Sequence, residues 1–218
     1  MLDRFDLVVF DWDGTLSDST AAIVRAIQDA AVDLGLPVPD DATASHVIGL
    51  GLHEALARAV PTLPPERIGE YSARYRVHYM AREAELVLFP GVRELITDLR
   101  AGGVPLAIAT GKSQRGLQRA LAQAGLSEEF AATRCADQTH PKPHPAMLLE
   151  LAEELMVVPQ RTLMIGDTSH DLQMALAANA AGVGLTTGAH PPEQLAACNP
   201  LALFDSLAEL HRWLMPRR

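Results

Sequence analysis

The sequence predicts an α/β fold, in which a doubly wound parallel sheet carries an inserted, all-helical subdomain. Short apolar runs rich in β-forming residues recur along the chain, and each ends at a polar or glycine-containing turn that a helical pattern follows. The stretch at 18–88, between the first and second runs, has helical apolar spacing and no strand-like segment. We therefore expect a sheet core built from residues 1–17 and 89–218 and a helical cap at 18–88.

Four apolar runs are the predicted strands of the sheet. They lie at 7–10, 105–110, 162–165 and 183–186. Short runs that are apolar throughout are typical of parallel strands buried on both faces. Ligands bind beyond the carboxyl ends of such strands, so the polar residues that follow each run are the candidates for a site.

Two helices are recognisable within the insertion. The apolar face of the first is formed by residues at helical spacing, namely Ile23, Ile27, Ala30 and Leu34. Gly35 then ends the pattern. The second helix is expected to start near Pro64 and Pro65, because proline is favoured in the first turn. One face of this helix holds Ile68, Tyr71, Tyr75 and His78.

The composition restricts the class of partner. The chain has 218 residues, 48% of them hydrophobic, and a formal net charge of −9. This charge argues against a nucleic-acid or anionic-membrane surface, which needs clustered Lys and Arg, but a local cation can still hold a phosphorylated substrate. Cys135 and Cys198 lack metal-site spacing and are expected to be reduced thiols. No apolar run reaches the roughly 18 residues of a membrane span, and Asp3, Arg4 and Asp6 interrupt any leader, so we expect a cytoplasmic protein.

The first candidate segment, Asp11-Trp12-Asp13-Gly14-Thr15, begins where the first run ends. In extended backbone, residues two apart face the same side, so the carboxylates of Asp11 and Asp13 can reach one cleft. Clustered carboxylates repel each other unless a cation or a shared proton intervenes, and hard oxygen ligands suit Mg²⁺. Taken alone, the segment could equally be a polar turn.

The second segment, Thr110-Gly111-Lys112-Ser113, follows the second run. A hydroxyl and free backbone N–H groups at a helix N-terminus can hold an anion. The last three residues resemble the end of a nucleotide-binding P-loop, but that motif needs a glycine five residues before Gly111, where Leu106 stands. We therefore expect an anion cradle rather than a nucleoside-triphosphate site.

Two further segments supply a cation and more carboxylates. Lys142 lies between Pro141 and Pro143, which restrict the backbone and reduce the entropy lost in aiming one long side chain. Asp167 follows the third run, and Asp171 comes one helical turn later. Locally, Lys142 could be an ordinary surface lysine, and Asp167 or Thr168 could be a helix N-cap with acidic residues in the first turn. The conjunction of the four segments is decisive, because together they assemble the nucleophile, metal site, anion cradle and cation that phosphoryl transfer needs.

With these four segments in order, the chain resembles the haloacid dehalogenase-like hydrolase superfamily, in particular its phosphoglycolate phosphatase-like branch. The resemblance covers essentially the whole chain, and it implies a Rossmann-like core with a helical cap inserted after the first segment. It also implies an Mg²⁺-dependent hydrolase of a small phosphorylated metabolite, with phosphoglycolate as the leading candidate. The chain is expected to be a monomer or a homodimer.

The resemblance implies roles for the four aspartates. Asp11 attacks phosphorus and forms an aspartyl phosphate. Asp13 protonates the leaving oxygen and then activates the water that hydrolyses the intermediate. The metal ligands are the side chains of Asp11 and Asp167 and the backbone carbonyl of Asp13, while Asp171 supports the metal site.

The resemblance also implies where the substrate is held. The Thr110 hydroxyl and the Gly111 amide bind phosphoryl oxygens, and Lys142 neutralises charge on the phosphoryl group and the nucleophile. Specificity is expected from the cap, where the loop 49–54 has glycines that permit close backbone approach. Within this loop, His53 is the candidate polar contact to the substrate. These glycines could instead simply end one cap helix and start the next.

Two other functions share parts of the pattern. Mutases of this branch usually carry an arginine in the cap loop that corresponds to 49–54, whereas the first arginine here is Arg58. A receiver-type signalling module also uses an acidic cluster, a phosphoacceptor aspartate, a threonine and a lysine, but it is shorter and has no cap-sized insertion. Dehalogenating and phosphonate-cleaving members of the superfamily lack an acid at the position of Asp13, because their reactions have no alkoxide leaving group to protonate. The presence of Asp13 therefore favours a phosphomonoesterase or a phosphomutase.

Overall fold

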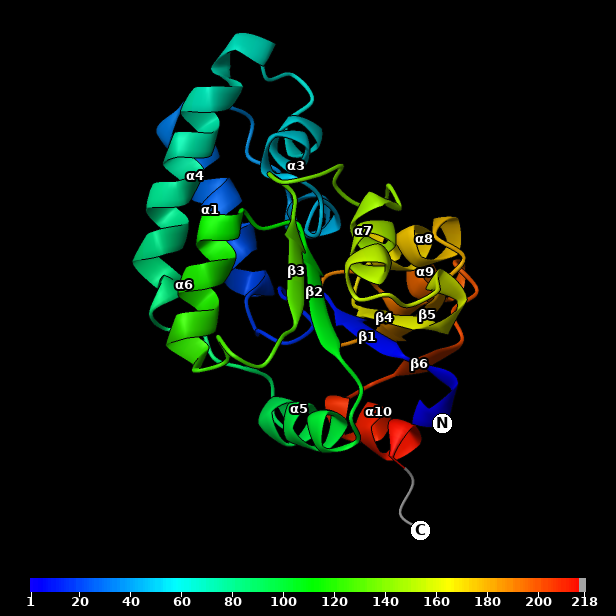
Figure 1. Ribbon diagram of the computed structural model, residues 1–218. Helices are drawn as coiled ribbons and strands as arrows, with labels where there is room; N and C mark the ends of the chain where they lie inside the picture. The colour runs from blue at the N-terminus through cyan, green and yellow to red at the C-terminus, as the bar shows by residue number, and fades with distance from the viewer. Residues whose placement is uncertain (216–218) are drawn as a thin grey trace.

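A six-stranded parallel sheet forms the centre of the protein in the computed structural model, which describes residues 1–215. The strands are β1 (Leu7–Phe10), β2 (Leu106–Thr110), β3 (Ala132–Cys135), β4 (Thr162–Gly166), β5 (Ala181–Leu185) and β6 (Ala202–Phe204). Their order in the sheet is β3-β2-β1-β4-β5-β6, and each neighbouring pair is parallel (Figure 1). The predicted α/β fold with a parallel sheet is confirmed.

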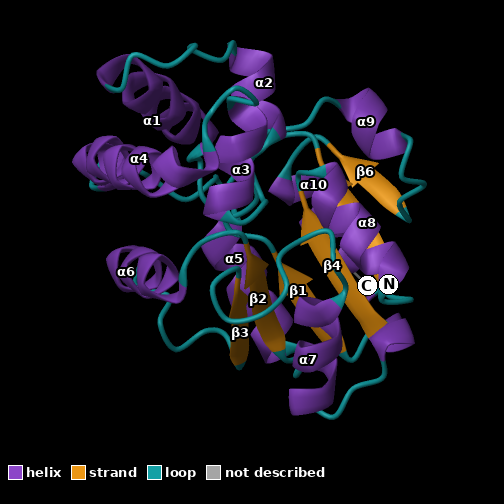
Figure 2. Ribbon diagram, turned by 90° about the horizontal axis from the view of Figure 1, so that it is seen from above, coloured by secondary structure: helices purple, strands orange, loops and turns teal. Residues whose placement is uncertain are grey.

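Helices cover both faces of the sheet, as a doubly wound fold requires. In β1, Val8 and Phe10 face one side while Leu7 and Val9 face the other, because strand side chains alternate. The first face is covered by α5 (Val92–Ala101), α6 (Gln114–Ala124) and α10 (Leu207–Leu214). The second is covered by α7 (Ala146–Glu154) and α8 (Ser169–Ala177), with α9 (Pro192–Ala196) beside α8 and β6. Figure 2 shows α6 and α7 on opposite sides of β2 and β3.

The insertion folds into helices that share a hydrophobic core of their own. They are α1 (Thr20–Asp33), α2 (Asp41–His46), α3 (Leu52–Ala59) and α4 (Ile68–Glu83), the last preceded by the 3₁₀ turn η2 (Pro65–Arg67). Ile23 and Ile27 of α1 are buried against Tyr71 of α4, whose hydroxyl donates to the Ile27 carbonyl at 2.9 Å. Among residues 1–215, no helix is long and apolar enough to cross a bilayer.

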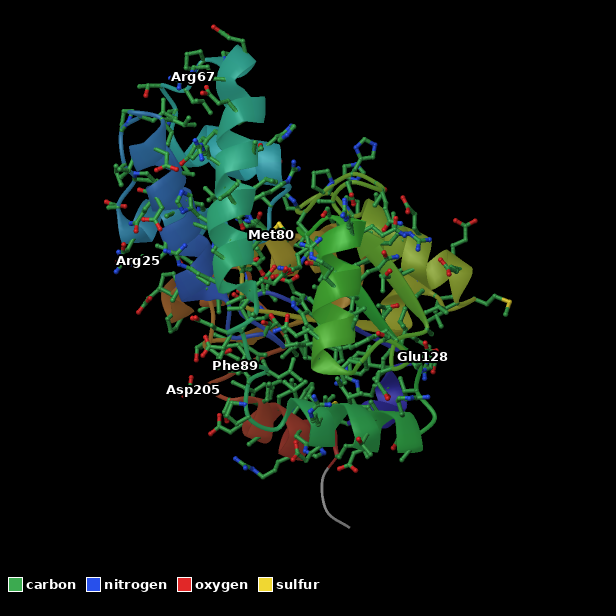
Figure 3. The ribbon with its side chains drawn as sticks, turned by 90° about the vertical axis from the view of Figure 1, so that its left-hand side faces the viewer. Arg25, Arg67, Met80, Phe89, Glu128 and Asp205 are labelled. Atoms are coloured by element: carbon green, nitrogen blue, oxygen red, sulfur yellow. The ribbon has the colours of Figure 1, made fainter. Side chains whose placement is uncertain are left out.

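The helical group meets the sheet-bearing part at two adjacent chain segments. Ser17, where the chain leaves the sheet, forms an antiparallel backbone bridge with Leu88, where it returns. In Figure 3, Phe89 lies at the base of the helical group, well below Met80 of α4. The division into a core of 1–17 and 89–218 and a cap of 18–88 stays a prediction, which this bridge supports; the last three residues of that core lie outside the described residues.

Two strands were not predicted, and one was displaced. β3 contains Arg134 in four residues, and β6 has only three residues, so neither forms a recognisable apolar run. Both are edge strands of the sheet, with a neighbour on one side only; the two middle side chains of β3 and all three of β6 are only partly buried. β5 begins two residues earlier than the run at 183–186, because its first residues are an alanine and a glycine that carry little apolar signal.

Candidate active site

The four candidate segments lie at the carboxyl ends of four adjacent strands. Asp11 follows β1, Thr110 ends β2, Lys142 lies in the loop after β3, and Asp167 follows β4. Because the strand order is β3-β2-β1-β4, Asp11 stands between its neighbours at the point where the chain changes direction across the sheet. Ligands of open α/β sheets bind at this point.

Three of the aspartates form a buried carboxylate cluster. Oxygen atoms of Asp11, Asp167 and Asp171 all lie within 4.8 Å of one another, and each residue is at most 1% exposed. The surrounding backbone leaves no spare space: a methyl group at Gly14 or at Gly188 would overlap the Asp167 carboxylate. Gly14 also has a φ of +80°, which residues with a side chain rarely adopt. Glycine at these two positions therefore lets the chain close around Asp167.

Lys142 supplies the positive charge in this cluster. Its ammonium nitrogen lies 2.8 Å from Asp11 Oδ1 and 2.6 Å from Asp171 Oδ1, and its side chain is fully buried. These three atoms form no well-directed hydrogen bond within residues 1–215, so the contact is an ion pair held by charge. Burial lowers the pKa of Lys142, but the two carboxylates outweigh it and hold the pKa above its usual value. Lys142 therefore remains charged.

One buried lysine does not balance three buried carboxylates. Burial raises the pKa of Asp11, Lys142 opposes the rise and Asp171 adds to it, which places the pKa at about 7. The pKa of Asp167 is raised well above its usual value, mainly by burial and to a smaller extent by repulsion from Asp11 and Asp171. The site is thus short of positive charge when all three carboxylates are ionised.

The oxygen atoms of the cluster fit a divalent cation. Asp11 Oδ2 is buried and has no hydrogen-bond partner among residues 1–215. Asp167 Oδ1 accepts from the Thr15 hydroxyl at 2.6 Å and Oδ2 from the Ala189 amide at 2.8 Å, so each oxygen keeps a further lone pair. A set of hard carboxylate oxygens suits Mg²⁺. Asp11 and Asp167 are therefore the residues that would hold the ion.

Asp171 has less freedom to bind a metal directly. Its Oδ2 accepts from the Thr168 amide at 3.1 Å and from the Thr168 hydroxyl at 2.6 Å, in a capping box at the start of α8. Its Oδ1 faces Lys142. This arrangement supports the expectation that Asp171 orients Lys142 and assists the metal site.

The Asp13 carboxylate points to a different set of partners. Lys112 Nζ lies 2.9 and 3.0 Å from its two oxygens, and the Ser19 hydroxyl donates to Oδ1 at 2.6 Å. The carboxylate is not part of the three-aspartate group, so among metal ligands only the Asp13 backbone carbonyl remains to be considered. This separation leaves the Asp13 side chain available for proton transfer.

Lys112 was underestimated from the sequence. Its resemblance to a P-loop lysine is coincidental, but its side chain nevertheless lies in the site, where it contacts Asp13 and donates to the Tyr79 hydroxyl at 2.7 Å. Tyr79 comes from α4 of the insertion, four residues after Tyr75, which was placed on the predicted apolar face. The four-residue spacing from Tyr75 was therefore the sequence pattern from which Tyr79 could have been predicted. No pattern around Ser19 indicates a role in the site.

The loop 49–54 reaches the site through its backbone. The carbonyl oxygens of Leu50 and Gly49 lie so close to Gly111 that a methyl group there would be 2.5 and 2.7 Å from them. Thr110, which precedes Gly111 at the end of β2, is fully buried, and its Oγ1 accepts a hydrogen bond from the Lys112 amide at 3.2 Å. His53 is exposed on α3, so its role in substrate binding stays a prediction.

Comparison with known proteins places this site in a family. A model described as "Haloacid dehalogenase-like hydrolase" matches residues 8–185. The probable phosphatase IndB of Dickeya dadantii is 38% identical over 211 residues, which are 94% of this chain and 91% of IndB. A phosphoglycolate phosphatase of Yersinia pestis is 33% identical over 209 residues, which are 93% of this chain and 90% of that protein.

Two further proteins show how far the similarity extends. Tyrosine-protein kinase PtkA of Mycobacterium tuberculosis is 38% identical over 173 residues, which are 78% of this chain but 58% of PtkA. The crystal structure of a predicted phosphoglycolate phosphatase from Haemophilus somnus is 28% identical, has a TM-score of 0.87, and covers 97% of this chain and 99% of its own. Fold, sequence and predicted resemblance agree: the chain belongs to the haloacid dehalogenase-like hydrolase family.

Proposed function

We propose that this protein is an Mg²⁺-dependent phosphatase that hydrolyses a small phosphomonoester by way of an aspartyl phosphate on Asp11. The observation that supports this most directly is the state of the Asp11 carboxylate. It is buried at the end of β1, one oxygen lies beside Lys142, and the other has no partner among residues 1–215. A desolvated carboxylate held next to a cation is equipped to attack phosphorus. The relatives named as phosphatases support the same reaction.

The residues of the site can be assigned to successive steps. Thr110 and the Gly111 amide would hold phosphoryl oxygens while Asp11 attacks phosphorus and Lys142 offsets the negative charge. A bound Mg²⁺ would shield further charge on the phosphoryl group. Asp13 would protonate the departing oxygen and then take a proton from the water that attacks the aspartyl phosphate.

The alternative of a phosphosugar mutase has less support. The loop 49–54 carries no arginine, and Arg58, the first one that follows, pairs with Glu54 at 2.6 Å on the exposed face of α3. No arginine of this loop is therefore present to hold a second phosphate. Among phosphomonoesters, phosphoglycolate remains the leading candidate substrate, because it is named for several relatives of similar length.

Hydrolysis of a substrate panel tests this proposal. Purified protein with Mg²⁺ is incubated with phosphoglycolate, sugar phosphates, nucleoside monophosphates and p-nitrophenyl phosphate, and released phosphate is measured over many turnovers. Activity should disappear in EDTA and return with Mg²⁺. No turnover of any substrate, or phosphoryl transfer from ATP to protein tyrosine without phosphatase activity, would overturn the proposal.

Mg²⁺ is expected to raise the melting temperature more at pH 8 than at pH 5. Burial raises the pKa of Asp11 to about 7 in the folded, metal-free chain, whereas an aspartate in the unfolded chain has a pKa of about 4. The folded chain therefore binds more protons between these values, and its stability falls as the pH rises through them. A cation would offset this loss only where the carboxylates are ionised.

Thermal unfolding in Mg²⁺ and in EDTA at both pH values measures this difference. Asp167→Asn removes one proposed metal ligand and serves as the control, in which the Mg²⁺ effect should be nearly absent. The idea fails if Mg²⁺ shifts the melting temperature equally at pH 5 and pH 8, or not at all.

Gly111→Ala is expected to lower kcat/KM on every substrate by about 10-fold or more, since displacements near 1 Å at a catalytic site have effects of this size. The added methyl group would lie 2.5 Å from the Leu50 carbonyl oxygen, so the cap loop must withdraw from the site. Gly69→Ala in α4, where nothing lies within 4 Å, is the matched control. Unchanged kinetics of Gly111→Ala would show that this loop does not close over the substrate.

A further inference from the structure

Lys112 uses all of its hydrogen-bonding capacity inside the protein. An ammonium group has three N–H bonds, and Lys112 Nζ has three partners: Asp13 Oδ1, Asp13 Oδ2 and the Tyr79 hydroxyl, at 2.9, 3.0 and 2.7 Å. The side chains of Lys112 and Asp13 are only 9% and 10% exposed. Lys112 is therefore directed at Asp13 and has no donor left for a substrate oxygen.

The same contacts determine where the Asp13 carboxylate points. Lys112 binds both of its oxygens, and the Ser19 hydroxyl donates to one of them at 2.6 Å. A carboxylate that must deliver a proton to one oxygen atom of the substrate needs a defined position, because proton transfer requires hydrogen-bond geometry. Without Lys112, the Ser19 hydroxyl would be the one hydrogen-bond partner left to the Asp13 carboxylate among residues 1–215.

Tyr79 makes this arrangement depend on the helical insertion. Lys112 belongs to the loop after β2, whereas Tyr79 belongs to α4, and the Lys112 ammonium also lies 4.6 Å from the centre of the Tyr79 ring. One turn further along α4, Glu83 binds Arg119 of α6 at 3.1 and 3.3 Å. Helix α4 is thus tied to the sheet-bearing part directly beside Asp13, and Figure 1 shows α4 and α6 side by side.

We propose that Lys112 is a positioning residue that, when backed by Tyr79, holds the Asp13 carboxylate in place for proton transfer. Docking of α4 against the loop after β2 completes the contacts of Lys112 and so couples closure of the helical insertion to the alignment of Asp13. This inference rests on the proposed phosphatase function, in which Asp13 protonates the leaving oxygen.

The leaving group separates this role from its alternatives. An alkoxide leaving group needs a proton, whereas p-nitrophenolate departs readily without one. In the formation of the aspartyl phosphate, which kcat/KM reports, a lysine that acts through Asp13 therefore matters for an alkyl phosphate and little for p-nitrophenyl phosphate. The later hydrolysis of the aspartyl phosphate is the same step for both substrates and affects kcat alone. A lysine that binds the substrate would change KM, and a purely structural lysine would affect both substrates alike.

The experiment measures kcat and KM of four variants on p-nitrophenyl phosphate and on the alkyl phosphate that the wild type hydrolyses best. Lys112→Met is expected to lower kcat/KM on the alkyl phosphate by about 10- to 100-fold and on p-nitrophenyl phosphate by less than about 3-fold. Tyr79→Phe, which removes one hydrogen bond, is expected to lower kcat/KM on the alkyl phosphate by about 5-fold. Asp13→Asn sets the full size of the effect. Arg119→Gln removes the ion pair with Glu83 but leaves both the Lys112–Tyr79 hydrogen bond and the bond from Gln123 to the Glu83 carbonyl in place, so it is the control with little loss.

A double variant completes the test. Lys112→Met in the Asp13→Asn background should cause no further loss, because Lys112 acts through Asp13. An additive loss, a change confined to KM, or equal losses of Lys112→Met on both substrates would overturn the inference. If Lys112→Met does not fold, the leaving-group dependence of Tyr79→Phe decides in its place.

The outcomes also distinguish this inference from the function on which it rests. If the wild type hydrolyses neither substrate, the proposed function fails. If Asp13→Asn shows the leaving-group dependence and neither Lys112→Met nor Tyr79→Phe does, the phosphatase function stands and only the role of Lys112 is wrong.

Discussion

Asp11→Asn is expected to lower kcat by about 10⁴-fold or more, because an amide neither attacks phosphorus nor serves as an anionic metal ligand. The substitution is nearly isosteric, which matters at a residue that is 1% exposed. The backbone at this position is also fixed, since the Asp11 amide donates to the Ile165 carbonyl at 2.9 Å. The loss should therefore reflect chemistry rather than unfolding.

The measurement is phosphate release together with trapping of a phosphorylated protein after rapid acid quenching. Wild type should carry the label on its chain, and Asp11→Asn should carry none. Asp18→Asn, at an exposed position outside the site, is the matched control and should retain full activity. If Asp11→Asn keeps more than about one hundredth of the wild-type activity, a loss far below that expected of a nucleophile, the covalent mechanism is wrong.

Lys142→Met is expected to lower kcat by about 10²- to 10³-fold on every substrate, a loss typical of removing one charge-stabilising group. Lys142 faces both Asp11 and Asp171 from a fully buried position, so its loss leaves the buried carboxylates without their cation. The dependence on the leaving group should be weak, because Lys142 acts on the phosphoryl group and the nucleophile. In this respect it should differ from Lys112→Met.

Stability provides an independent readout for the same variant. Lys142 lowers the pKa of Asp11, so without it this pKa should rise further, and the variant should lose more stability at pH 8 than at pH 5. Thermal unfolding in EDTA at the two pH values measures this. A loss of activity on p-nitrophenyl phosphate that is equal for Lys112→Met and Lys142→Met, or larger for Lys112→Met, would reverse the assignment of the two lysines.

The sequence was sufficient for the features that local patterns encode. The apolar runs that became β1, β2 and β4 are buried in the centre of the sheet, where nearly all side chains are apolar. The polar residues that end them are then brought together by parallel topology alone. Asp11, Thr110 and Asp167 could therefore be placed at one edge without knowledge of any long-range contact. The edge strands β3 and β6 were not predicted, because strands that are only partly buried have a weaker apolar pattern.

The tertiary structure alone decided which side chains act on each other. Lys112 and Asp13 are separated by 99 positions, and Lys112 and Tyr79 by 33, so no periodicity or motif spacing records their contact. Their meeting depends on how α4 docks against the loop after β2, which is set by packing between the helical insertion and the sheet-bearing part. The same docking brings the backbone of Gly49 and Leu50, and not the exposed His53, against the anion cradle. Sequence alone identifies the chemistry of a residue, but the direction in which a side chain points follows from contacts between segments that are distant in the chain.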